Sequence, residues 1–171
     1  MNLLIGDVCL YKKTTTFMSK AIALVTTSSR THAGVVYAID ARFVYVAESQ
    51  KEGFVIVPYE IDYFEDLLGG RILTRRSRVP IKEVQLIIDK YVGLKYGFLD
   101  LIFILLYVIT GKILFKDTTK RLICSEAVAR VLYDCSKKSI NFEKEFNKPF
   151  SYITPDDLNQ SIQLKDVWGL K

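Results

Sequence analysis

Cys124 is the residue of this sequence best placed to act as a nucleophile. It opens a segment, residues 124–132, whose apolar residues recur at helical spacing. A cysteine in the first turn of a helix lies beside backbone N–H groups that have no partner within the helix. These groups favour negative charge, so they lower the thiol pKa and could hold an oxyanion, with Ser125 in the same turn. Burial of an unreactive thiol in the core is the competing interpretation.

A thiolate nucleophile needs a base, and the sequence contains a single histidine, His32. A cysteine–histidine site must therefore combine Cys124 with His32. The other two cysteines are weaker candidates. Cys9 lies in an apolar strand and is predicted to be core, and Cys135 lies near the C-terminal end of the cysteine helix, where the helix dipole disfavours a thiolate.

Composition restricts the classes of function. The 171 residues are half apolar and one quarter charged, which predicts one globular domain spanning 1–171. The net charge of +5 comes without a nucleic-acid-binding motif, so no nucleic-acid partner is predicted. One histidine and three dispersed cysteines predict neither a metal site nor a cofactor. An odd number of cysteines without framework spacing, and the lack of a signal-peptide pattern, predict a cytoplasmic protein.

The elements that must position Cys124 and His32 follow from the hydrophobic patterns. Strands are predicted at residues 4–11, 32–39, 43–48, 54–57 and 71–76, and helices at 17–25, 61–68, 80–92 and 124–135. Residues 136–148 are expected to be an exposed connection, and a short helix is expected to start with Thr154 as its N-cap and Pro155 at its first position. The predicted fold class is α+β, an antiparallel sheet of about five strands packed against helices that include the cysteine helix.

The predicted strands also supply a third polar group for the site. Residues 32–57 form a meander in which His32 opens the first strand and Glu48 ends the second. A carboxylate on the neighbouring strand could accept the second imidazole N–H and fix the tautomer of the base. Asp40 and Gln50 are the alternatives to Glu48, and a solvated strand end is the simpler interpretation of that residue.

Residues 99–109 are apolar on nearly every side. The run is shorter than the roughly 20 residues that span a bilayer, so a helix buried in the core or under a lid is predicted, close to the mouth of the site. The alternative is a surface helix that contacts a membrane or lines an acyl-binding groove.

The order of these motifs resembles that of a known family. The order is a polar loop, His32-Ala33-Gly34, an acidic strand end, a helix leading to a loop with Tyr96, Cys124-Ser125-Glu126 and Thr154-Pro155-Asp156-Asp157. This order resembles the circularly permuted branch of the NlpC/P60 papain-like superfamily, in particular the YiiX/YebB-like cysteine hydrolases. In ordinary papain-like enzymes the cysteine helix precedes the histidine strand, whereas here the histidine comes first.

The resemblance implies a permuted papain-like fold and a set of roles. Cys124 is expected to be the nucleophile, His32 the base, Glu48 the orienting residue, and Tyr96, like Ser125, a substrate-binding or oxyanion residue. The implied activity is hydrolysis of an amide or ester bond through a thiol acyl-enzyme, with a peptide or peptidoglycan-type amide as substrate. Two alternatives stay open: a lipid-directed acyltransferase or phospholipase of the permuted papain-like group, and a catalytically inert binding or structural module.

Overall fold

The structure is a computed structural model that describes residues 2–12, 30–68, 70–97, 103, 106, 107, 110–113 and 121–167. The helix predicted at residues 17–25 lies outside this part of the chain, as does most of the apolar run 99–109. The four described residues of and next to that run, at positions 103, 106, 107 and 110, are helical.

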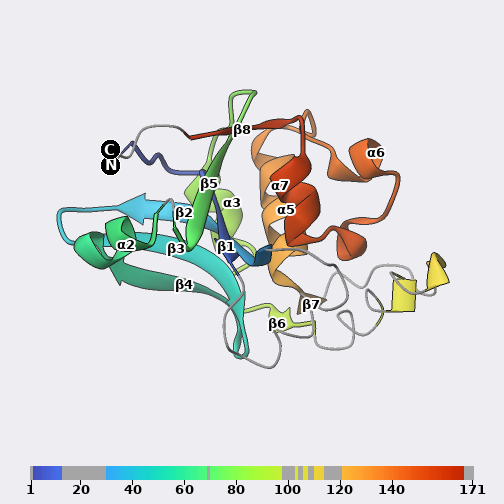
Figure 1. The fold of residues 1–171 in the computed structure, drawn as a ribbon, viewed down its shortest axis with the longest axis horizontal. Coiled ribbons are helices and arrows are strands. Elements are labelled where there is room, and N and C mark those ends of the chain that lie inside the picture. Colours follow the sequence, from blue (N-terminus) through green and yellow to red (C-terminus); the bar gives the residue numbers. More distant parts are fainter. Residues whose placement is uncertain are drawn as a thin grey trace.

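A six-stranded sheet organises the molecule, with the strand order β4-β3-β2-β1-β5-β8 (Figure 1). Each neighbouring pair in it is antiparallel. The predicted α+β class is therefore observed, with one strand more than the predicted number of about five. The strands are β1 (Val8–Lys12), β2 (Arg30–Ile39), β3 (Phe43–Gln50), β4 (Gly53–Glu60), β5 (Ile72–Ser77) and β8 (Leu164–Asp166).

The β2–β3–β4 meander forms where the sequence predicts it, because both of its turns have suitable residues. The side chain of Asp40 accepts hydrogen bonds from the backbone N–H groups of Arg42 and Phe43, which closes the first turn. Gly53 at the second turn has φ +131, a conformation that favours glycine. The resulting register places Gly34 opposite Glu48.

The two faces of the sheet are covered by different helices, because side chains alternate along each strand. Val35 and Ala47 point to one face, where α3 (Val84–Asp89) and α5 (Cys124–Cys135) complete the larger core. Val36 and Val46 point to the other face, which α2 (Ile61–Leu67) covers. Figure 1 shows α5 and α2 on different sides of the sheet.

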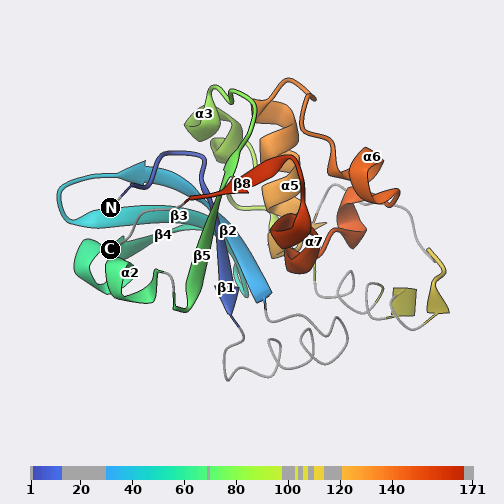
Figure 2. The ribbon, with the colours of Figure 1, turned by 45° about the horizontal axis from the view of Figure 1, so that its top comes forward.

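The C-terminal third adds short elements around α5. These are α6 (Phe142–Phe146), the 3₁₀ helix η1 (Phe150–Tyr152) and α7 (Pro155–Gln160). Thr154 caps α7 as predicted: its hydroxyl accepts from the backbone N–H of Asp157, whose carboxylate accepts from the backbone N–H of Thr154 in return. Figure 2 shows β8 leading from α7 to the edge of the sheet beside β5.

Three predictions of secondary structure are corrected. The helix predicted at 80–92 is observed only as α3, because Glu83 has φ 54 and the preceding N–H of Lys82 is bonded to the carbonyl of Cys135. Residues 136–148 are not simply an exposed connection, since Ile140 and Phe142 are buried. The predicted loop that contains Tyr96 includes β6 (Lys95–Tyr96), which pairs in parallel with β7 (Arg121–Leu122).

None of the helices in the described part of the chain is both long enough and apolar enough to cross a bilayer.

Candidate active site

Cys124 occupies the first position of α5, which is the position that the sequence predicts. Ile123 is the N-cap, and the first hydrogen bond inside the helix runs from the N–H of Ala127 to the carbonyl of Ile123. The N–H groups of Cys124 and Ser125 are therefore not used by the helix ladder. This leaves backbone donors beside the sulfur, which is where a thiolate or a developing oxyanion needs them.

His32 comes from β2 and meets the thiol from the sheet side. The two side chains lie close enough for the charge and hydrogen bonding of Cys124 to raise the pKa of the His32 imidazole. The His32 side chain is 28% exposed, whereas Cys124 is 5% exposed, so a substrate would reach the sulfur from the side where the imidazole is open. The ring of Tyr11 packs on the imidazole, with the ring centroids 5.2 Å apart.

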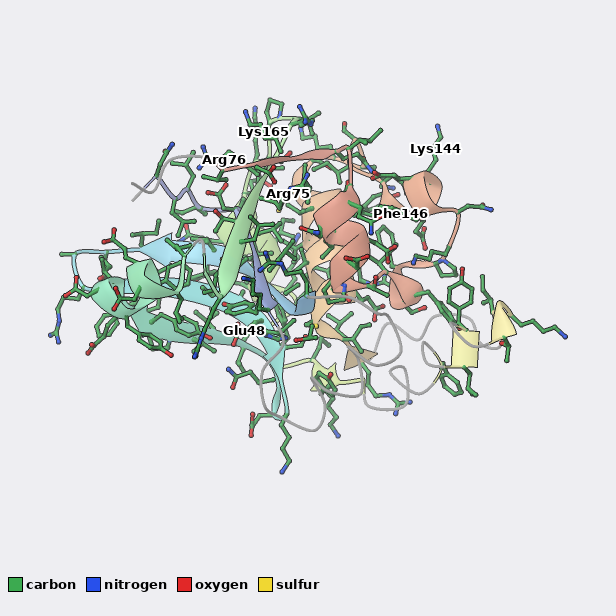
Figure 3. All side chains as sticks on the ribbon, viewed as in Figure 1. Glu48, Arg75, Arg76, Lys144, Phe146 and Lys165 are labelled. Atoms are coloured by element: carbon green, nitrogen blue, oxygen red, sulfur yellow. The ribbon has the colours of Figure 1, made fainter. Side chains whose placement is uncertain are left out.

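Glu48 completes a linear arrangement of three side chains. Its Oε2 lies 3.3 Å from Nε2 of His32, which leaves Nδ1 as the nitrogen for Cys124. The carboxylate is 3% exposed, and its Oε1 accepts hydrogen bonds from Nε2 of Gln50 and the hydroxyl of Tyr59. Glu48 is therefore no solvated strand end, and Figure 3 labels it on the sheet.

The charges of this group favour a thiolate–imidazolium pair. Burial raises the pKa of Cys124, but the charge and hydrogen bond of His32 and the N–H groups of Ala33 and Ser125 outweigh it and lower the pKa from its usual value. Burial lowers the pKa of His32, but Cys124 and Glu48 outweigh it and raise the pKa to about 10. The two shifts have the same cause, since each charge stabilises the other.

Tyr96 and Ser125 both lie close to the thiol and contribute different groups. Tyr96 lies on β6 opposite Leu122, two residues before Cys124 in the chain, and burial together with the nearby Cys124 raises its pKa. The hydroxyl of Ser125 donates to the carbonyl of Ile153 at 2.6 Å. Ser125 therefore offers the sulfur its backbone N–H, while its side chain holds α5 to the segment that leads into α7.

The alternatives to these residues lie elsewhere or act differently. The carboxylate of Asp40 is bound within its own turn and accepts from the hydroxyl of Tyr45, and Gln50 is a donor to Glu48 and not its substitute. Cys9 is fully buried, and burial raises its pKa. Burial and Asp134 likewise raise the pKa of Cys135. Within the described residues, no group of three or more His, Cys, Asp or Glu side chains is placed to hold a metal ion.

Tyr59 and Tyr11 were not among the residues predicted for this site. Single tyrosines in strands usually pack in a core, and neither motif order nor spacing points to them. The available signal was strand alternation, which puts Glu48 and Tyr59 on one face of the sheet once the β3–β4 register is known.

Comparison with known proteins supports the fold and leaves the chemistry open. No family model matches the sequence, and no curated protein matches it. Among solved structures, the metalloprotein YiiX from Escherichia coli O157:H7 (DUF1105) superimposes with a TM-score of 0.65 over 98% of each chain. The chain has a YiiX-like fold. The sequence identity to YiiX is 17%, so the similarity concerns the fold alone.

Proposed function

We propose that this protein is a cysteine hydrolase of the permuted NlpC/P60 papain-like superfamily, formed by one domain over residues 1–171. The observation that carries the proposal is the line of Cys124, His32 and Glu48, brought together from α5, β2 and β3. A thiol, an imidazole and a buried carboxylate in this order provide a nucleophile, a base and an orienting group. The YiiX-like fold over 98% of the chain supports the superfamily.

The proposed reaction is acyl transfer to the sulfur. The Cys124 thiolate attacks the carbonyl carbon of an amide or ester, and the N–H groups at the start of α5 stabilise the oxyanion. Collapse breaks the bond to the amine or alcohol, which leaves with the proton of the His32 imidazolium. His32 then takes a proton from water as the water attacks the thioester. Collapse breaks the carbon–sulfur bond, which releases the carboxylic acid and restores the thiolate–imidazolium pair.

YiiX is described as a metalloprotein, but this does not lead to a metal step here. His32 lies between Cys124 and Glu48, so the three side chains form a chain of pairs and do not converge on a common point. A metal ion needs several ligands around one position. The described residues of the site therefore do not fit a metal ion, and the proposed reaction uses none. The three free thiols fit a reducing compartment such as the cytoplasm.

The test is capture of the acyl-enzyme. We expect an electrophilic acyl probe to label the intact protein once, at Cys124, with the site identified by peptide mass spectrometry. Cys124→Ala should abolish the label, and Cys135→Ala should retain it, because Cys135 is buried and its pKa is raised. A protein whose Cys124 reacts with iodoacetamide and acyl probes no faster than a model thiol would be an inert module of the same fold.

One observation favours a lipid-directed acyltransferase or phospholipase as the second candidate. Phe103 and Tyr107, from the apolar run 99–109, pack against Ile123 and Tyr152, and Ile123 directly precedes Cys124. This places aromatic surface beside the proposed nucleophile, where an acyl chain or a membrane surface would be met. Incubation with phosphatidylcholine vesicles carrying labelled acyl chains tests this candidate: transfer of label to Cys124 supports it, and cleavage of peptide amides without lipid turnover contradicts it.

A further inference from the structure

We infer that Tyr59 is a positioning residue of the proposed site, which holds the Glu48 carboxylate so that Oε2 faces His32. This inference rests on the proposed function. Tyr59 is not one of the three side chains Cys124, His32 and Glu48. It lies on the face of the sheet that α2 covers, opposite the face that α5 covers.

The hydrogen bonds of Glu48 are divided unequally between its two oxygens. Oε1 accepts from Nε2 of Gln50 at 2.9 Å and from the hydroxyl of Tyr59 at 3.1 Å. Oε2 is buried, lies 3.3 Å from Nε2 of His32, and has no well-aligned hydrogen-bond donor among the described residues. Two donors on one oxygen fix the plane of the carboxylate, and this presents the second oxygen to the base.

Tyr59 is not the residue of β4 that lies directly opposite Glu48, so its side chain must extend along β3 to bring its hydroxyl to the carboxylate. In the register of β3 and β4, Tyr59 lies opposite Val44, four residues from Glu48. The ring therefore leans over the face of the sheet, and its position depends on what packs on it. Phe64 of α2 is fully buried and packs against this ring, with 5.7 Å between the ring centroids. Helix α2 thus holds Tyr59 in place through Phe64, and Tyr59 in turn holds the Glu48 carboxylate.

Burial and the charge of Glu48 raise the pKa of Tyr59, so its hydroxyl stays a donor over the working pH range. Burial also raises the pKa of Glu48, whereas His32, Gln50 and Tyr59 hold it below its usual value. The groups facing the carboxylate are Cys9 and Tyr11 from β1, His32 from β2, Gln50 from β3, Tyr59 from β4 and, across the imidazole, Cys124 from α5.

The experiment uses the single histidine as a reporter. In full-length Cys124→Ala protein, the His32 ring signal in an NMR titration carries an acid inflection when Glu48 takes up a proton. Tyr59→Phe removes the hydroxyl and keeps the ring. The inflection is therefore expected to move to higher pH by about 0.5–1 unit, which means that the acid dissociation constant of Glu48 falls about three- to tenfold. Gln50→Met removes the other donor to the same oxygen and should move it in the same direction.

Tyr91→Phe is the matched control, because it removes a tyrosine hydroxyl that donates to the Asp134 carboxylate at 2.8 Å, outside the site. The inference is overturned if the acid inflection of the His32 signal lies at the same pH in Tyr59→Phe and Tyr91→Phe. If Tyr59→Phe does not fold, an inflection that stays at its original pH in Gln50→Met overturns it instead. With Cys124 present, Tyr59→Phe should also lose acyl labelling at pH 5 more than at pH 8. Absence of any labelling in the unaltered protein would refute the proposed hydrolase, while the titration would still decide the role of Tyr59.

Discussion

The sulfur of Cys124 is the atom whose reactivity is most sensitive to its neighbours. His32 and two backbone N–H groups lower its pKa below the ordinary value of 9.0. Alkylation by iodoacetamide should therefore reach half of its maximal rate below pH 9. In His32→Ala the midpoint should move to higher pH and the rate at pH 7 should fall about tenfold for each pKa unit. Both the midpoint and the rate can be measured by quenching the alkylation at successive times and weighing the product by mass spectrometry. An unchanged midpoint in His32→Ala would contradict the ion pair.

The alkaline side of the profile reports on Glu48. His32 has a pKa raised to about 10, so the imidazolium that protonates the leaving group is present below that pH and is lost as the pH rises through it. Glu48→Gln removes a charge that raises this pKa. We expect the alkaline limb of acyl-enzyme formation to move down by about one unit. Asp40→Asn, an exposed carboxylate bound in its own turn, is the control and should leave the limb in place.

Gly34 sets the spacing of β2 and β3 where His32 and Glu48 meet. A Cβ at this position would lie 2.6 Å from Cγ1 of Val46 and 3.2 Å from Cβ of Glu48. Gly34→Ala must therefore push β3 away from β2, and we expect the alkylation rate of Cys124 at pH 7 to fall along with the melting temperature. Gly70→Ala is the control, because an added Cβ there meets only the carbonyl of Leu67 at 3.9 Å. Equal rates in the two variants would show that strand spacing does not control the site.

Helix α7 depends on its N-terminal cap and not on its length. The reciprocal hydrogen bonds between Thr154 and Asp157 start a helix of six residues, and Nζ of Lys148 lies 2.7 Å from Oδ2 of Asp157. Thr154→Ala should lower the free energy of unfolding by about 1 kcal/mol in chemical denaturation. The alkylation rate of Cys124 should stay unchanged, because α7 contributes no group to the line of three side chains. A Thr154→Ala variant that lost thiol reactivity would contradict this separation.

The contrast between α7 and α3 shows what local sequence can predict. Thr154, Pro155 and Asp157 satisfy the backbone of α7 locally, and Thr154 and Pro155 were enough to predict where it starts. The hydrophobic pattern predicted a helix from residue 80, but the chain from Pro80 to Glu83 stays outside the helix because the N–H of Lys82 is bonded to the carbonyl of Cys135, far along the sequence. Such long-range contacts are invisible to a periodicity argument.

The two ends of the described chain are held to the sheet by neighbouring arginines of β5. Arg75 donates to the backbone carbonyls of Asn159, Ser161 and Leu164 and pairs with Asp166, while Nε of Arg76 lies 2.7 Å from Asp7 (Figure 3). Arg75→Met should cost about 2–3 kcal/mol of unfolding free energy, because several buried carbonyls lose a charged donor. Lys165→Met on β8 is the control and should change stability by less than about 0.5 kcal/mol. A small loss in Arg75→Met would show that β8 docks without this side chain.

The meander, the cysteine helix and the α7 cap were predictable because each depends on neighbouring residues. Cys124 and His32 could be paired because the sequence has a single histidine, and Glu48 followed from the meander; the structure brings these three side chains together. What the sequence could not indicate depends on distant pairings. Strand β8 exists because Leu164 and Lys165 meet β5, and Tyr59 approaches Glu48 only through the register of β3 and β4.

The position of α5 on the sheet has a consequence during synthesis. Strands β1 to β5 are complete at residue 77, but the helix that covers Ala33, Val35 and Ala47 ends at Cys135. At about 5–20 residues per second, a ribosome leaves that apolar face uncovered for several seconds. The contacts that cover it join residues far apart in the chain, which makes this step slow. The nascent chain therefore carries its histidine and carboxylate before its thiol, and it gains a reactive sulfur only when α5 docks.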